Sequence, residues 1–239
     1  MKKIFLFTII VAVAFIFVSC DKEKNNEKKS NNKSVSIDMM KLPVYYNGVE
    51  MNCLMEDFKK PASKGGDMEE VSLVFEDAIH IFDEDAAFYD FCLEEEMMDI
   101  YGTNQKLDLI YAKAEVLGLT EIEDEVGYDE IPIEMHQYWS QVFSTSIPEA
   151  DRNLAGRLFS GQNCTQDSKG FIPVFYPSFG DFNNKARSFE ICGILSHGWM
   201  CTKKWFGGPR MWYFCPLGIK KYNSLSATYD QKICSTFGF

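Results

Sequence analysis

The chain has 239 residues, 46% of them hydrophobic, and it carries a formal net charge of −11 at pH 7. This length is enough for one large or two small domains with apolar cores. The acidic balance argues against nucleic acid as a partner, because the phosphate backbone attracts basic surfaces.

The N-terminus predicts a secretory signal, residues 1–20. Lys2 and Lys3 precede an apolar run, residues 4–18, which is shorter than the about 20 residues that a membrane-spanning helix needs. The run ends in a small residue before Cys20, which resembles the cleavage site of bacterial lipoproteins. The resemblance implies acylation of Cys20 and a lipid anchor in the cell envelope, in the outer membrane of a Gram-negative bacterium. An uncleaved N-terminal anchor is the alternative.

Residues 21–33 are charged, low in complexity and free of apolar side chains. Such a segment cannot bury a core, so we expect a disordered tether.

The charge balance of residues 34–239 changes sign along the sequence. Residues 34–150 hold 6 basic and 27 acidic side chains, and residues 151–239 hold 11 and 5, with 17 aromatic residues. The shift predicts two domains, 34–150 and 151–239. Their opposite charges indicate docking on each other, or else an anionic partner for the basic one.

In the acidic domain the sequence predicts a hairpin with a tight turn at Asn47-Gly48 and a short strand over 71–75. Three helices follow. The first ends at Gly102, the second runs from Thr103 to Gly118, and the third covers 135–143. This gives an α+β domain that is mostly helical. Its acidic runs have the pattern of solvated helix faces, and they do not form a calcium-binding loop.

Seven cysteines follow Cys20, and none forms a C-x-x-C pair. Because disulfides are permitted in an exported protein, we expect one or two in the C-terminal part. The candidates are Cys164, Cys192, Cys201, Cys215 and Cys234. An odd count leaves at least one thiol free, or paired between chains.

The C-terminal part repeats itself. YPSFGDFNNKARS, residues 176–188, is similar to YNSLSATYDQKICS, residues 222–235, and each closes on a serine. Upstream, residues 159–166 correspond to 201–208. The repeat predicts two β-rich units of about 40 residues. The terminal serine of each is expected to hydrogen-bond across a turn.

These motifs resemble the βγ-crystallin family over about residues 155–239. The resemblance implies an all-β Greek-key sandwich of two repeated four-stranded units. It also implies calcium ligands at Asn183, Asn184 and Asp230. Binding members carry a hydroxyl at the fifth motif position, where this chain has Arg187 and Cys234, so we expect a degraded calcium site and no cofactor.

Three function classes follow. The first is a non-catalytic binding or structural module, with a recognition loop for a protein or glycan at Trp205, Phe206, Arg210 and Trp212. The second is a peptidase inhibitor that uses a rigid loop, 193–198 or 207–210, because similar microbial inhibitors resemble a βγ-crystallin unit. The third, an enzyme, has no supporting motif. His197 lies four residues before Cys201, but this spacing does not make a catalytic pair.

Overall fold

The computed structural model describes residues 34–61, 66–122, 128–147, 156–171, 175–226 and 228–238. Residues 33–239 form one compact unit. Its helices are α2 (Asp85–Glu94), α3 (Met98–Val116) and α4 (Ile133–Phe143). Its strands are β1 (Ser34–Asp38), β2 (Pro43–Tyr46), β3 (Val49–Leu54), β4 (Val71–Phe75), β5 (Ala78–Phe82), β6 (Gly156–Phe159), β7 (Ser168–Phe171), β8 (Phe175–Tyr176), β9 (Ser188–Cys201), β10 (Arg210–Ser224) and β11 (Ser235–Gly238).

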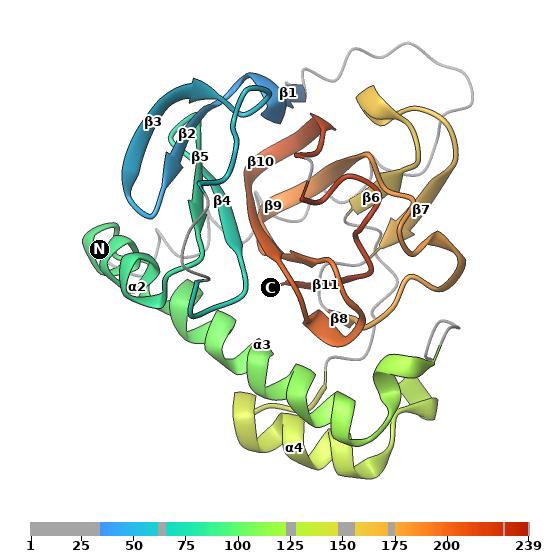
Figure 1. The fold of residues 1–239 in the computed structure, drawn as a ribbon. Helices are drawn as coiled ribbons and strands as arrows, with labels where there is room; N and C mark the ends of the chain where they lie inside the picture. The colour runs from blue at the N-terminus through green and yellow to red at the C-terminus, as the bar shows by residue number, and fades with distance from the viewer. Residues whose placement is uncertain are drawn as a thin grey trace, which may run out of the picture. The chain divides into compact units, whose positions relative to one another are not determined.

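The strands form one hydrogen-bonded sheet with two wings, because the long strands β9 and β10 have different neighbours at their two ends (Figure 1). In the first wing the order is β7-β6-β9-β10-β1, with residues 188–191 of β9 pairing with β6. In the second wing the order is β3-β2-β5-β4-β10-β9-β11-β8, with residues 198–201 of β9 pairing with β11. Pairings within the wings are both parallel and antiparallel.

The sheet continues across the domain boundary that the charge shift predicts near residue 150. β4 pairs in parallel with the start of β10, and β1 pairs in parallel with its end. Strands of the acidic segment therefore extend both wings, and residues 34–150 and 151–239 do not form separate sheets. The charge shift instead marks two surfaces that face each other within one unit.

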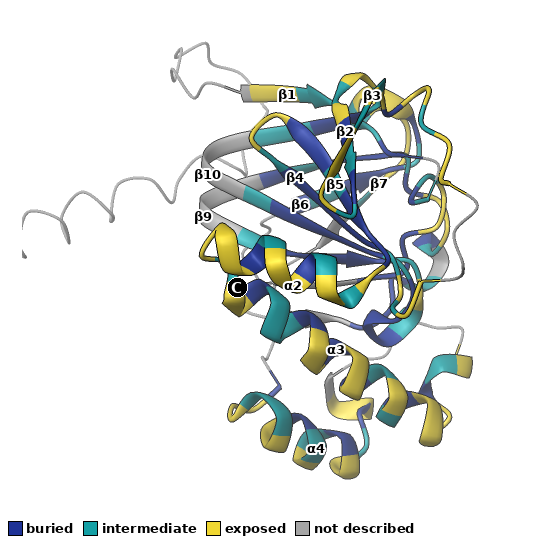
Figure 2. Cartoon of the chain, turned by 60° about the vertical axis from the view of Figure 1, so that its left-hand side comes forward, coloured by how far each residue is buried: buried dark blue, intermediate teal, exposed yellow. Residues whose placement is uncertain are grey.

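The centre of the second wing, where β4, β10 and the end of β9 lie, is buried on both faces. Met200 and Met211 pack in one core cluster with Phe189 and Tyr222, between the wings. Their strand neighbours Trp199 and Trp212 pack in a second cluster with α3 and α4. Figure 2 shows the helices against the sheet, with buried residues facing it and exposed residues on their outer sides. Burial on two faces explains why neighbouring residues on these strands, such as Trp199 and Met200 or Met211 and Trp212, are both apolar instead of alternating with polar ones.

Three local predictions concern glycines: the turn at Asn47-Gly48 and the helix ends at Gly102 and Gly118. Asn47 and Gly48 both have positive φ, 46° and 78°, so the tight primed turn is confirmed. Gly118, with φ 71°, follows the end of α3 as predicted. Gly102 does not end a helix: α3 runs through it, and the break lies before Met98, where Glu96 has φ 56°. A glycine weakens a helix but does not stop one that tertiary packing supports.

No helix in the described part of the chain is long and apolar enough to cross a membrane. The predicted signal at residues 1–20, with Cys20, and the tether at 21–33 lie outside the described residues.

Candidate functional site

The two repeated units contain the same serine latch. Ser188 Oγ donates to the carbonyl of Gly161 at 2.6 Å and accepts from the backbone N–H of Cys164 at 2.9 Å. Ser235 Oγ donates to the carbonyl of Lys203 at 2.7 Å and accepts from the N–H of Phe206 at 3.1 Å. Both serines are completely buried. The predicted structural role of the repeated serine is thus present in both units.

The turns that the serines hold have matching backbones. Cys164 and Phe206 have φ of 54° and 68°, and Gln166 and Gly208 have φ of 66° and 68°. The left-handed region is unfavourable for glutamine and not for glycine. Cys164 and Gln166 therefore adopt the conformation of the aromatic residue and glycine that they replace.

The polar corners meet each other across an approximate two-fold relation. The N–H of Asn184 donates to the carbonyl of Ile233 at 3.2 Å, and the N–H of Gln231 donates to that of Ala186 at 2.7 Å. The residue at each fifth position reaches the opposite corner. The Cys234 thiol donates to Asn184 Oδ1 at 3.3 Å. Arg187 is the other fifth-position residue.

Arg187 Nε lies 3.8 Å from Asp230 Oδ1. With the Gln231 amide turned so that its oxygen faces Arg187, that oxygen accepts from Arg187 Nη2 and Nε at 3.0 and 3.1 Å.

These contacts do not suit a hard cation. Asn183 Oδ1 accepts from the N–H of Phe179 at 2.9 Å, and Asn184 and Asp230 face a thiol and a guanidinium. A calcium ion needs six to eight oxygen ligands, and a positive side chain beside the site repels it. Among the described residues, no group of three or more His, Cys, Asp or Glu side chains has a metal-binding arrangement.

The predicted disulfides are not seen at the described cysteines. Cys164, Cys201 and Cys234 are free thiols. The side chains of Cys192 and Cys215 lie outside the described part, but their strand positions are known. Cys192 is opposite Ile219 and Cys215 is opposite Ser196, so they are four residues out of register, about 13 Å. A disulfide needs Cα atoms within about 7 Å, so these two cannot bridge in this register.

The predicted recognition loop is buried. Trp205 and Phe206 are 0% exposed, Arg210 is 1% exposed and Trp212 is 5% exposed. They pack under α3 and α4, and a Cβ on Gly207 would lie 2.2 Å from the Tyr111 ring. Trp205, Phe206 and Arg210 cannot act as an exposed binding loop, because the acidic segment covers them, whereas Trp212 lines a pocket.

Arg210 links the two charged segments. Its Nη1 lies 2.7 Å from Asp108 Oδ1 and 2.9 Å from Asn104 Oδ1, both on α3. Its Nε donates to the carbonyl of Phe206 at 2.7 Å. A buried guanidinium satisfied in this way explains why the basic segment carries an arginine at this position. It supports intramolecular docking of the two segments.

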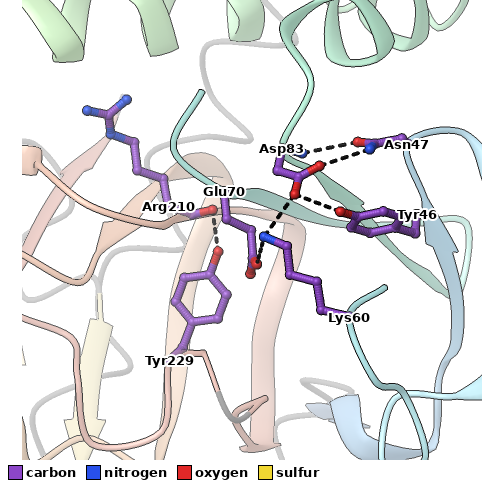
Figure 3. A network of polar contacts seen from close by, with 7 residues as sticks. All are labelled: Tyr46, Asn47, Lys60, Glu70, Asp83, Arg210 and Tyr229. Carbon is purple, nitrogen blue, oxygen red and sulfur yellow. Dashed lines mark hydrogen bonds and ion pairs between the residues drawn. The ribbon is translucent and has the colours of Figure 1, made fainter. Parts of the chain in front are cut away.

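A second polar network joins the strands of the acidic segment (Figure 3). Asp83, 3% exposed in its side chain, accepts from the Tyr46 hydroxyl at 2.6 Å and from Asn47 Nδ2 at 2.9 Å. Lys60 Nζ lies 3.0 Å from Asp83 and 3.3 Å from Glu70. Burial raises the pKa of Asp83, but these hydrogen bonds and the lysine charge outweigh it, so the pKa is lowered. The carboxylate is held charged by its partners.

The sequence pair His197 and Cys201 does not form a catalytic pair. Both lie on β9, four residues or about 13 Å apart. Cys201 is completely buried, and burial raises the pKa of its thiol to about 12. A thiol in this state is not a nucleophile at neutral pH.

One opening among the described residues is a pocket of about 500 Å³ beside α3, at the edge of the second wing. It lies where β4 and β10 separate, because their pairing stops at Leu73 and Trp212. Trp212, Phe214 and His197 of the β9–β10 hairpin line one side. The remaining lining residues come from β1, β4 and its following turn, α3 and β10: Ile37, Val74, Phe75, Glu76, Asp77, Met97, Asp99, Ile100 and Lys220.

The pocket was not predicted, because its lining comes from segments up to about 180 residues apart that only the sheet brings together. The one signal in the sequence is the mainly apolar composition of β4 and of residues 211–214 in β10, which indicates that both faces are covered.

No family model and no curated protein matches the chain. Among solved structures, a βγ-crystallin domain from Flavobacterium johnsoniae is 16% identical and matches 36% of this chain and 93% of its own length, with a TM-score of 0.31. A beta gamma crystallin from Ciona intestinalis is 16% identical over 35% of this chain and 98% of its own, with a TM-score of 0.29. A domain from Clostridium beijerinckii is 13% identical, with coverage of 36% and 97% and a TM-score of 0.30. About a third of this chain is therefore similar to βγ-crystallin domains, in agreement with the predicted resemblance.

Proposed function

We propose that the chain is a non-catalytic binding protein whose ligand site is the pocket between β4, β10 and α3. The observation that carries this proposal is the pocket itself, about 500 Å³ in volume and lined mainly by apolar and aromatic side chains. Small-molecule sites in proteins have volumes of roughly 300–1,000 Å³ and linings of this kind, with a few polar groups that orient the ligand.

The proposal includes two Greek-key units of βγ-crystallin type in residues 156–238. The strand pairing supports it. In one group the strands pair in the order β7, β6, start of β9, end of β10, and in the other they pair in the order start of β10, end of β9, β11, β8. Each group thus combines three strands of one unit with a strand of the other, which joins the two units. In this proposal the units are a scaffold, and calcium has no place in the mechanism.

A non-catalytic role is supported by the state of the candidate reactive groups. The oxygens of Asp83 are hydrogen-bonded, and the Cys201 thiol is buried with a raised pKa. Neither opens into the pocket, whose described lining contains no serine, threonine or cysteine. The pocket is therefore better suited to holding a ligand than to attacking one.

The peptidase-inhibitor alternative loses its two candidate loops. Residues 207–210 are covered by α3, and Arg210 is 1% exposed. Residues 193–198 belong to β9, which pairs with β10 along this stretch. An inhibitor must present an exposed loop to the protease cleft, and neither segment does so.

The proposed location is the outer membrane of a Gram-negative bacterium, with the lipid on Cys20 as the membrane contact. The N-terminal sequence supports this, and the location is independent of the pocket. In cells fed a labelled fatty acid, the chain should become labelled and fractionate with membranes. Cys20→Ala should abolish both, and labelling of that variant would contradict the proposal.

The binding function is tested by thermal denaturation of the folded chain in the presence of a small-molecule collection. A ligand that binds only the folded state adds about 2.7 kcal/mol at 100 times its dissociation constant, so bound compounds should raise the Tm. The variant Met97→Trp fills the mouth of the pocket from the start of α3 and should lose these shifts. Compounds that raise the Tm of the variant equally, or a collection with no active compound, would contradict the pocket as the site.

A further inference from the structure

We propose that the pocket is selective for an organic cation, a ligand with an apolar body and one positively charged nitrogen. This inference rests on the proposed binding function and names the ligand class of the same site. It follows from two features of the lining: an aromatic side, and a rim with three carboxylates against a single lysine.

The aromatic side is formed by two neighbouring residues of β10. The rings of Trp212 and Phe214 are parallel within 5°, with centroids 5.9 Å apart, and the His197 ring lies 6.4 Å from that of Trp212. The face of an aromatic ring carries negative electrostatic potential, and indole attracts cations most strongly. These rings therefore suit both the apolar body of a ligand and an adjacent positive charge.

The rim is acidic on two sides. Glu76 and Asp77 form the turn between β4 and β5, with φ of 49° and 60°, and both are exposed. Asp99 is exposed in the first turn of α3. All three residues line the pocket. The turn and the start of the helix thus place three carboxylates among the residues that line the pocket.

Lys220 is the only lysine or arginine in the described lining. Its Nζ donates to the carbonyl of Phe214 at 3.2 Å and stands 5.3 Å from the centre of the Tyr222 ring. An anionic ligand would have to compete for this ammonium group and pass three carboxylates. The N-terminus of α3 gives an anion no alternative, because Asp99 occupies its first turn.

The test compares three probes with the same apolar body: phenethylammonium, phenethyl alcohol and phenylacetate. Binding to the folded chain is followed by the NMR signal of the Trp212 indole N–H, assigned with Trp212→Phe. The ammonium probe should bind about tenfold more tightly than the alcohol, a difference of about 1.4 kcal/mol, and phenylacetate should bind least.

Two matched triple variants distinguish the effect of the carboxylates at the rim from the effect of the net charge of the chain. Replacing Glu76, Asp77 and Asp99 with their amides should reduce the preference for ammonium to about twofold or less. Replacing Glu94, Glu95 and Glu96 with glutamine removes the same charge from an exposed run that does not line the pocket, and should leave the preference unchanged.

The outcomes distinguish failure of the cation selectivity from failure of the pocket as a binding site. If the alcohol binds as tightly as the ammonium probe, the inference of cation selectivity is wrong and the proposed binding function stands. If both triple variants lose the preference equally, the charge effect is not that of the rim, and the inference is again wrong. If no probe shifts the Trp212 signal of the folded chain at millimolar concentration, the inference and the pocket as a binding site both fail.

Discussion

At the scale of single residues, a few buried polar side chains determine how the segments are held. Ser188 and Ser235, both buried, each satisfy one donor and one acceptor of a turn backbone, and one of the two bonds of each serine is fully buried. Leaving such groups unsatisfied costs more than the net value of a hydrogen bond, because the groups have already lost water.

Ser188→Ala and Ser235→Ala should therefore each lower the free energy of unfolding by about 1–3 kcal/mol. The effects should be similar, since the two latches have the same geometry. Urea denaturation measures both. Ser36→Ala, which removes an exposed hydrogen bond to Asn223, serves as the control and should change stability by no more than about 0.5 kcal/mol. If Ser188→Ala and Ser235→Ala both lower the free energy of unfolding no more than Ser36→Ala does, the two serines do not stabilise the fold.

Arg210→Met should lower the free energy of unfolding by about 3 kcal/mol. The substitution leaves Asn104 and the carbonyl of Phe206 without their buried donor. The control is Lys203→Met, because Lys203 also faces an acidic residue, Glu69 at 3.7 Å, but is half exposed. An exposed pair contributes about 1 kcal/mol or less. Equal effects of the two substitutions in urea denaturation would contradict the assigned role of Arg210.

Asp83 gives a pH dependence with a definite sign. Because its folded-state pKa is lowered, its carboxylate stabilises the fold above the ordinary value of 3.8, and this contribution is lost as pH falls through the folded-state pKa. Part of the fall in Tm below about pH 4 should therefore disappear in Asp83→Asn. Asp90→Asn, an exposed substitution on α2, should keep the acid sensitivity. Parallel Tm curves for the original chain and Asp83→Asn would exclude this role.

At the scale of elements, the two units use the same turn with different residues. Gly208 meets its positive φ without strain, whereas Gln166 adopts nearly the same φ with a side chain. The second unit therefore has the better residue at this position.

Gly208→Ala should destabilise by more than about 1 kcal/mol, because of the positive φ and because its Cβ would lie 2.6 Å from Thr202 Oγ1. Gln166→Gly should stabilise slightly, by up to about 1 kcal/mol. Paired urea denaturation curves measure both. If Gly208→Ala stabilised the chain and Gln166→Gly destabilised it, the two turns would not be equivalent.

The same elements show what local sequence predicts well. The turn at Asn47-Gly48, the end of α3 at Gly118 and the serine latches follow from residue types that a specific backbone conformation requires. Such requirements act over a few residues. The burial of Trp205 and Arg210 depends instead on α3, about 100 residues earlier, and no local pattern contains that information.

At the scale of the whole molecule, the charge shift near residue 150 led to a division that the sheet does not follow. β1 and β4 extend the strands of the C-terminal segment, and the acidic helices cover its aromatic residues. A change in charge along the sequence does not by itself mark a domain boundary, because oppositely charged segments can also belong to one folded unit. The pocket arises from this arrangement, because it lies where strands of the two segments separate.

The most direct test of the account is scanning calorimetry of residues 21–239, because the central claim is that residues 33–239 form one cooperative unit. We predict a single transition whose calorimetric and van't Hoff enthalpies agree, and Arg210→Met should move that whole transition to lower temperature. Two separate transitions, one of them matching that of isolated residues 151–239, would contradict the claim and restore two independent domains.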